Sequence, residues 1–207
     1  MVSDKFAVNG WTKLTTQLSG PDVAKLIDDV SAAQGSRRLQ NMTALERHLT
    51  PELKTELRSH GLRPTPIRGV SFIKTKAENW SLPWHQDRVV AMAKRHSDAG
   101  YTNWSSKSGI WHCEPPLDQL EKIAFLYIAL DTVTARSGGI ELARGSHHLG
   151  KIQAADIAKA VQGTKCDAPL LSTGESLLVS ALTLHRSRAN QTENPRRAIR
   201  LDFTNRD

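Results

Sequence analysis

The segment 82–87 brings together residue types that can bind a metal ion. It contains a His-x-Asp pair, His85 and Asp87. Side chains two positions apart on a β-strand point to the same face, so on a strand this imidazole and carboxylate would lie side by side. Two histidines and one carboxylate form the facial triad of non-haem Fe(II) oxygenases. Because a His-x-Asp pair also arises by chance, this interpretation needs a third ligand elsewhere in the chain.

His185 is the candidate for that third ligand. It follows the apolar run 177–184 and precedes a polar, turn-rich segment. If a turn is centred near residues 190–191, antiparallel hairpin pairing would place Arg196 beside His185. Two imidazoles and one carboxylate leave three positions of Fe(II) open, enough for a 2-oxo acid and O₂. A nearby guanidinium could then clamp the far carboxylate of 2-oxoglutarate through two hydrogen bonds.

Two other histidines, His147 and His148, are weaker metal-ligand candidates. They are adjacent within the turn-forming sequence 145–150, so on a strand they would face opposite ways. We predict that they are turn residues. They become the next candidates if His185 proves dispensable.

The composition is that of a soluble globular protein. The chain has 207 residues, 39% hydrophobic and 24% charged, and no apolar run approaches the ~20 residues of a membrane span. The N-terminus lacks a signal-peptide pattern, which predicts a cytoplasmic protein without a membrane partner. Cys113 and Cys166 lie far apart, so we expect two reduced thiols and no cysteine-based metal site.

The formal net charge of +7 could indicate a nucleic-acid partner. Many of the arginines, however, lie near the C-terminus without the interleaved aromatic residues that a base-stacking surface needs. We therefore expect a small-molecule substrate and no nucleic-acid partner. A basic nucleic-acid-binding module remains an alternative that rests on charge alone.

The pattern of elements predicts helices first and strands afterwards. Apolar residues in the segment 20–35 recur at helical spacing, and a second helical stretch, 42–60, restarts at Thr50 and Pro51. Short strands separated by turns follow, with one further helix at 154–162; the expected strands are 67–73, 85–90, 123–130, 140–143, 177–184 and 198–203.

This order predicts a mainly β fold with flanking α-helices, a double-stranded β-helix or cupin-like jelly roll with a helical N-terminal extension. We expect one domain over residues 1–207. Residues 1–65 would form the helical flank and residues 66–205 the jelly-roll core.

The segment 93–116 is polar and reads as a long loop carrying Tyr101, Trp104 and Trp111. A long loop in a compact domain is often a lid or binding loop. The other interpretation is a structural loop held in place by its aromatic residues. On the first interpretation Trp104 is a candidate substrate contact.

Three stretches together carry a resemblance to a known family: 83–87, the glycine-containing run 137–147, and 185–203. In their order and spacing the chain resembles the phytanoyl-CoA dioxygenase family of Fe(II)/2-oxoglutarate-dependent oxygenases over roughly residues 67–205. The resemblance implies Fe(II), 2-oxoglutarate and O₂ as cofactors, with ascorbate as a candidate reductant. It also implies hydroxylation of a small-molecule metabolite with release of succinate and CO₂.

The resemblance assigns roles to individual residues. His85, Asp87 and His185 match the iron ligands, and no catalytic residue beyond the metal centre is implied. Arg196, eleven residues after His185, matches the arginine that binds the C5 carboxylate of 2-oxoglutarate. The other cosubstrate-pocket positions that the family pattern matches are Ser187, Lys74 and Tyr127. Halogenating relatives lack the carboxylate ligand, so the presence of Asp87 favours hydroxylation.

Arg196 and Arg197 are adjacent and would face opposite sides of a strand. Burial alone favours Arg197, which shares a face with Ile199 and Leu201. The expected hairpin and the family spacing favour Arg196, which shares the face of Ala198 and Arg200. We choose Arg196, because the apolar face can then pack against the helices. The main alternative function is a cupin-like metal-binding protein without oxygenase activity, such as an isomerase or a sensor.

Overall fold

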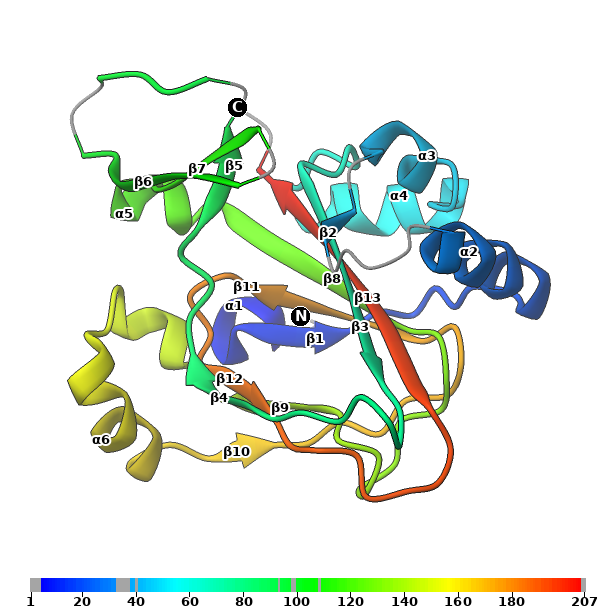
Figure 1. Ribbon diagram of the computed structural model, residues 1–207. Coiled ribbons are helices and arrows are strands. Elements are labelled where there is room, and N and C mark those ends of the chain that lie inside the picture. Colours follow the sequence, from blue (N-terminus) through cyan, green and yellow to red (C-terminus); the bar gives the residue numbers. More distant parts are fainter. Residues whose placement is uncertain are drawn as a thin grey trace.

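The computed structural model describes residues 5–32, 38–39, 41–92, 94–97, 100–107 and 109–205. Its centre is a pair of facing antiparallel sheets, the jelly roll that the sequence predicted (Figure 1). The larger sheet runs, in order, β1 (Trp11–Lys13), β11 (Ser176–Ser180), β8 (Ile123–Ala129), β13 (Arg196–Thr204), β3 (Arg68–Lys74) and β2 (Arg38–Leu39). The smaller sheet runs β10 (Cys166–Asp167), β9 (Ile140–Ala143), β12 (His185–Ser187) and β4 (Leu82–His85).

The central strand β13 separates two cores by the alternation of its side chains. Ile199, Leu201 and Phe203 are fully buried against the helices on the outer face of the larger sheet. Ala198 belongs instead to the core between the two sheets, which also contains residues of β8, β9 and β11. This two-sided burial agrees with the near-continuous apolar sequence of β8.

The helical flank packs on the outer face of the larger sheet (Figure 1). It consists of α2 (Gly20–Ala32), α3 (Met42–Glu46) and α4 (Pro51–Ser59). The hydroxyl of Thr50 accepts a hydrogen bond from the Leu53 amide, and Pro51 occupies the first turn, which is a favourable start for α4. None of the helices described is long and apolar enough to cross a bilayer.

The strand pairing of the smaller sheet contradicts two predictions made from the sequence. β12 pairs with β4 and β9, with His185 opposite His85 and Leu142. The expected hairpin between His185 and Arg196 is therefore wrong, because residues 188–195 carry the chain from the smaller sheet to the larger one. The expected strand 85–90 is also wrong: β4 ends at His85, and β5 (Val90–Met92) joins a different sheet.

The described part of the segment 93–116 forms strands where the sequence predicted a loop. β6 (Thr102–Lys107) and β7 (Ile110–Glu114) pair as a hairpin, and β5 completes a three-stranded sheet with the order β5-β7-β6. The sequence prediction missed this hairpin because its strands carry many polar residues and neither shows alternating burial: β6 has no buried residue, and β7 buries His112, Cys113 and Glu114 in succession. The remaining helical elements are α1 (Lys5–Asn9), α5 (Leu117–Leu120), η1 (Ser146–Leu149), η2 (Ala154–Asp156) and α6 (Ile157–Gln162).

Candidate active site

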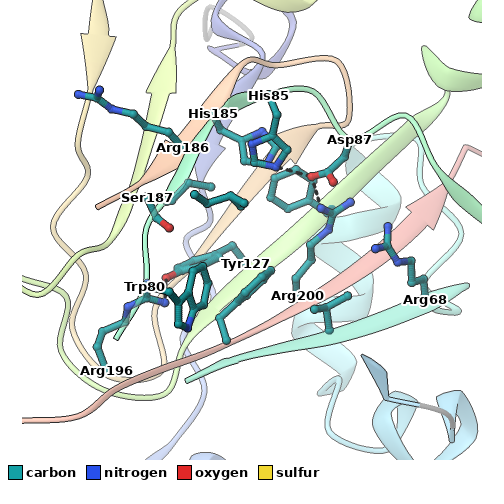
Figure 2. Close-up of a pocket in the computed structure, with 15 residues that line it drawn as sticks. Arg68, Trp80, His85, Asp87, Tyr127, His185, Arg186, Ser187, Arg196 and Arg200 are labelled. Atoms are coloured by element: carbon teal, nitrogen blue, oxygen red, sulfur yellow. Dashed lines mark hydrogen bonds and ion pairs between the residues drawn. The ribbon is translucent and has the colours of Figure 1, made fainter. Parts of the chain in front are cut away.

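The three predicted metal ligands lie close together between the sheets. The donor atoms of His85, Asp87 and His185 all lie within 4.8 Å of one another. His85 and His185 are direct neighbours on β4 and β12, with ring centroids 4.2 Å apart. Nε2 of His185 lies 2.9 Å from Oδ2 of Asp87 (Figure 2). The smaller sheet thus positions both imidazoles, and the chain that leaves β4 brings the carboxylate to them.

Backbone carbonyl groups fix the orientation of both imidazoles. Nδ1 of His85 lies 2.8 Å from the Pro83 carbonyl oxygen, and Nδ1 of His185 lies 2.8 Å from that of Thr183. A carbonyl oxygen can only accept, so Nδ1 donates in each ring, and Nε2 is left as the nitrogen that can bind a metal ion once it carries no proton. Metal-binding histidines are usually held by this kind of hydrogen bond. Both Nε2 atoms are thereby prepared to donate to a metal ion.

The charge states of the cluster also fit a divalent cation. Burial, with a further contribution from His185, lowers the pKa of His85 to about 4 and favours a neutral imidazole. Burial alone would raise the pKa of Asp87, but Arg200 and His185 hold it well below its usual value. At neutral pH the site offers a neutral His85 and an ionised Asp87, which is the ligand chemistry that Fe(II) requires.

The side chain of Gln86 fixes the turn that carries Asp87. Its Nε2 donates to the carbonyl oxygens of Gly150 at 2.7 Å and Leu182 at 2.8 Å, and its Oε1 accepts from the Ile152 amide at 2.9 Å. The Asp87 amide in turn donates to the Ala181 carbonyl oxygen at 3.0 Å. These bonds replace the strand pairing that ends at His85, so Asp87 reaches the histidines from outside the strand.

A cavity of ≈ 190 Å³ lies beside the three ligands, between the two sheets. Arg196 enters it from β13 (Figure 2). The Arg196 side chain is buried, and its guanidinium donates to the Tyr127 hydroxyl at 3.1 Å and the Gly138 carbonyl oxygen at 2.5 Å. Its Nε is buried and has no hydrogen-bond partner among the described residues. A buried cation with an unused donor suits a carboxylate ligand.

Lys74 and Ser187 lie beside Arg196. Lys74 is opposite Arg196 in the pairing of β3 with β13, and its Nζ donates to the Ser187 hydroxyl at 3.0 Å and the Gly138 carbonyl oxygen at 3.2 Å. A further short contact joins Nζ to the Arg188 carbonyl oxygen. Burial, and secondarily the charge of Arg196, lowers the pKa of Lys74 to about 7.

Arg197 points away from the cavity. Its guanidinium forms a two-point ion pair with Asp131, with distances of 2.7 and 2.9 Å, and it is partly exposed. Of the two adjacent arginines, only Arg196 lines the cavity.

Trp104 does not line this cavity, although it was a candidate substrate contact. Its ring packs edge-on against His96 and Trp111, with centroids 5.1 and 6.3 Å away, on the three-stranded sheet. His147 and His148 lie in η1 as expected of turn residues, with ring centroids 3.8 Å apart.

Sequence reasoning did not assign roles to several cavity residues that the structure brings to the site. Arg200 is the most informative of them, because it contacts the Asp87 carboxylate directly and was already expected on the Arg196 face of its strand. Strand alternation was therefore a usable signal for Arg200. Arg68, Trp80 and Phe125 also line the cavity, and they depend on the pairing of distant strands.

Comparison with known proteins places the chain in a family. A family model described as phytanoyl-CoA dioxygenase (PhyH) matches residues 15–198. The chain belongs to this family. It is accordingly an enzyme of the non-haem iron, 2-oxoglutarate-dependent oxygenase class. The search of curated proteins found no match.

Solved structures of similar fold include several whose titles name non-heme enzymes. A structure titled as a nickel complex of the non-heme monooxygenase ThoJ has a TM-score of 0.67 at 19% identity, covering 99% of this chain and 77% of ThoJ. The non-heme alpha-ketoglutarate-dependent carbocyclase SnoK from nogalamycin biosynthesis has a TM-score of 0.66 at 14% identity, and the match covers 98% of this chain and 82% of SnoK. EctD from S. alaskensis has a TM-score of 0.64 at 15% identity, and the match covers 97% of this chain and 75% of EctD. At these levels of sequence identity, the similarity to the solved structures shows the fold alone.

Proposed function

We propose that this protein is a 2-oxoglutarate-dependent hydroxylase that oxidises a small-molecule metabolite and releases succinate and CO₂. The observation that carries the proposal is the convergence of His85, Asp87 and His185 with their donor atoms within 4.8 Å of one another. In this proposal the three residues hold Fe(II) through the two Nε2 atoms and a carboxylate oxygen. The chain acts as one oxygenase domain, with residues 1–65 as its helical flank.

Arg196 binds the C5 carboxylate of 2-oxoglutarate in this scheme. Its buried, partly unpaired guanidinium supports the assignment, and so does its place across the cavity from the histidines. Lys74 adds positive charge at the same end, while Tyr127 orients the guanidinium through its hydroxyl. Ser187 accepts from Lys74 and offers its hydroxyl proton to the carboxylate.

Iron and 2-oxoglutarate, when bound, supply the oxidising chemistry with O₂ as co-reactant, and ascorbate is a candidate reductant. The contribution of the chain is to orient the cosubstrate and to keep water away from it. Phe72, Phe125 and Ile140 give the cavity apolar walls for this purpose. Asp87 keeps the carboxylate position filled, which favours hydroxylation over halogenation.

Anaerobic Fe(II) titration of alanine variants tests the metal assignment. Each of H85A, D87A and H185A is expected to lose Fe(II) affinity and turnover, with circular dichroism confirming that the jelly roll remains folded. H148A is the matched control, because His148 is an exposed histidine in η1. Full activity of H185A would overturn the assignment.

The reaction class is tested separately by following succinate release while metabolite pools are screened with the Fe(II)-loaded enzyme. Release that depends on both 2-oxoglutarate and an added metabolite is the expected result. Iron binding without any 2-oxoglutarate turnover would instead indicate a metal-binding protein of another activity.

A further inference from the structure

The floor of the cavity is built from two paired strands, β3 and β13. The register places Lys74 opposite Arg196, Phe72 opposite Ala198, Val70 opposite Arg200 and Arg68 opposite Asp202. The floor therefore carries Lys74 and Arg196 at one end, is apolar in the middle, and carries Arg68 and Arg200 together with Asp202 at the other end, the Arg68–Arg200 end. The two arginines of β13 are four residues apart, or about 13 Å along a strand.

The two ends of the cavity floor lie on different sides of the metal ligands. Figure 2 shows Arg196 at one end of the cavity and Arg68 at the other, with Arg200 reaching up to Asp87. In the proposed function 2-oxoglutarate spans the interval from Arg196 to the metal. That leaves the Arg68–Arg200 end free for another molecule.

At this second end the arginines have carboxylate partners but retain unused donors. Arg200 is buried, donates through Nε to Asp202 at 2.5 Å and contacts Asp87 through Nη1. Arg68 donates through Nη1 to the Val89 carbonyl oxygen at 3.1 Å and lies 3.5 Å from Asp202. Nε of Arg68 is buried without a hydrogen-bond partner, and Nη2 of neither arginine bonds to any of the described residues.

The charges at this end are balanced only while Asp87 is available to Arg200. Arg68 and Arg200 carry two positive charges, and Asp87 and Asp202 carry two negative ones. When Asp87 serves as a metal ligand, its charge is shared with a dication. The Arg68–Arg200 end then has an excess of positive charge in a cavity with apolar walls, where an added anion is attracted strongly.

We propose that the Arg68–Arg200 end binds the carboxylate of the substrate, so that the enzyme selects small carboxylic acids whose apolar part lies against Val70 and Phe125. This inference rests on the proposed function, because it requires Asp87 to be a metal ligand and 2-oxoglutarate to occupy the Arg196 end. The planar fork of Arg68 suits a carboxylate, which it can meet through Nε and Nη2 together. The two ends of the floor thus bind two different carboxylates.

Calorimetric titration of the protein loaded with Ni(II) and saturated with 2-oxoglutarate tests this. The probes are carboxylates paired with their uncharged amides: acetate with acetamide, phenylacetate with phenylacetamide, and hexanoate with hexanamide. We expect at least one carboxylate to bind tenfold or more tightly than its amide. Arg68→Met, which keeps an unbranched side chain without the charge, is expected to abolish this preference, and Arg68→Lys to retain only part of it.

The outcomes separate the inference from the function on which it rests. If 2-oxoglutarate binds but no carboxylate is preferred over its amide, the inference is overturned and the proposed function stands. If the preference persists in Arg68→Met, the anion binds elsewhere and the inference is again overturned. If neither Ni(II) nor 2-oxoglutarate binds to the wild-type protein, the proposed function fails. If Arg68→Met does not fold, Arg68→Lys decides the question: a reduced preference for the carboxylate supports the inference, and an unchanged preference overturns it.

Discussion

At the metal centre, two backbone carbonyl oxygens determine which nitrogen of each histidine faces Asp87. The Pro83 and Thr183 carbonyl oxygens accept hydrogen bonds from Nδ1 of His85 and His185, respectively. The residue types could be predicted from sequence, because a histidine and a carboxylate two positions apart are visible in the chain. The tautomers could not, because they depend on carbonyl groups whose direction is set only by the folded backbone.

The adjacent arginines 196 and 197 allow a matched comparison. Arg196→Ala removes a buried charge from the cosubstrate end of the cavity, and losing one partner of such a pair costs about 2–5 kcal/mol. We expect the KM for 2-oxoglutarate to rise by about 30-fold or more, with Fe(II) affinity largely unchanged. Arg196→Lys should recover only part of the loss, because an ammonium lacks the planar fork.

Arg197→Ala is the control for this measurement. It removes a partly exposed ion pair with Asp131, which contributes at most about 1 kcal/mol of stability. Its KM for 2-oxoglutarate should be close to that of the wild type. A defect in Arg197→Ala with none in Arg196→Ala would contradict the assignment of the carboxylate to Arg196.

Lys74 should make 2-oxoglutarate binding depend on pH. Its pKa is lowered to about 7 by burial and by Arg196, so at pH 8 the amine is mostly neutral. A bound dianion raises that pKa, so binding at pH 8 takes up a proton and the affinity falls as the pH rises above about 7. Calorimetry in two buffers of different ionisation enthalpy measures the uptake.

Lys74→Met is expected to abolish that proton uptake, and an unchanged uptake would exclude Lys74 as its source. The same shift affects the free protein. Between about pH 7 and pH 10.5 the unfolded chain binds more protons at this residue than the folded one, so the free energy of unfolding rises with pH across this range. Lys74→Met should remove that rise.

At the scale of elements, the sequence predicted three candidate ligands that the structure brings together, but partly for a wrong reason. His85 and Asp87 were expected on one strand, but β4 ends at His85 and Asp87 lies in the following turn. Arg196 was expected beside His185 in a hairpin, but the two residues belong to different sheets and line the same cavity. Local periodicity cannot show where a chain changes sheets, because that depends on contacts between distant strands.

Gln86 is expected to determine how well this turn holds the metal. Gln86→Leu keeps the side-chain size but removes three hydrogen bonds, to Gly150, Leu182 and Ile152. Loss of such supporting contacts typically lowers metal affinity by about 10–100-fold. Anaerobic Fe(II) titration measures the change, with Gln153→Leu as the control because Gln153 is exposed. Equal affinity in Gln86→Leu and the wild type would show that Asp87 is held by other contacts.

At the scale of the molecule, the order of helices and strands was enough to predict the jelly roll and its helical flank. The apolar residues Val23, Leu26 and Val30 are buried at the helical spacing that the sequence displays. The hairpin of β6 and β7 was missed, because neither strand shows the alternating burial that identifies a strand: β6 has no buried residue, and β7 buries its last three residues in succession. Strands with a regular apolar pattern were predictable, and strands of mixed polar residues were not.

The helical flank and the candidate site lie on opposite faces of the larger sheet, which predicts that stability and metal binding can be changed separately. Leu57 on α4 is fully buried in the outer core. Leu57→Ala should lower the free energy of unfolding by about 2–5 kcal/mol in chemical denaturation. Leu170→Ala, at a leucine that is 61% exposed, should change it by no more than about 0.5 kcal/mol.

Under conditions where both leucine variants are folded, each should bind Fe(II) as the wild type does, because neither substitution touches the inner face of β8 or β13. A tenfold loss of Fe(II) affinity in folded Leu57→Ala would contradict this separation. It would mean that the helices set the positions of Arg196 and Arg200 through Ile199, Leu201 and Phe203 of the same strand, which pack in the same outer core as Leu57.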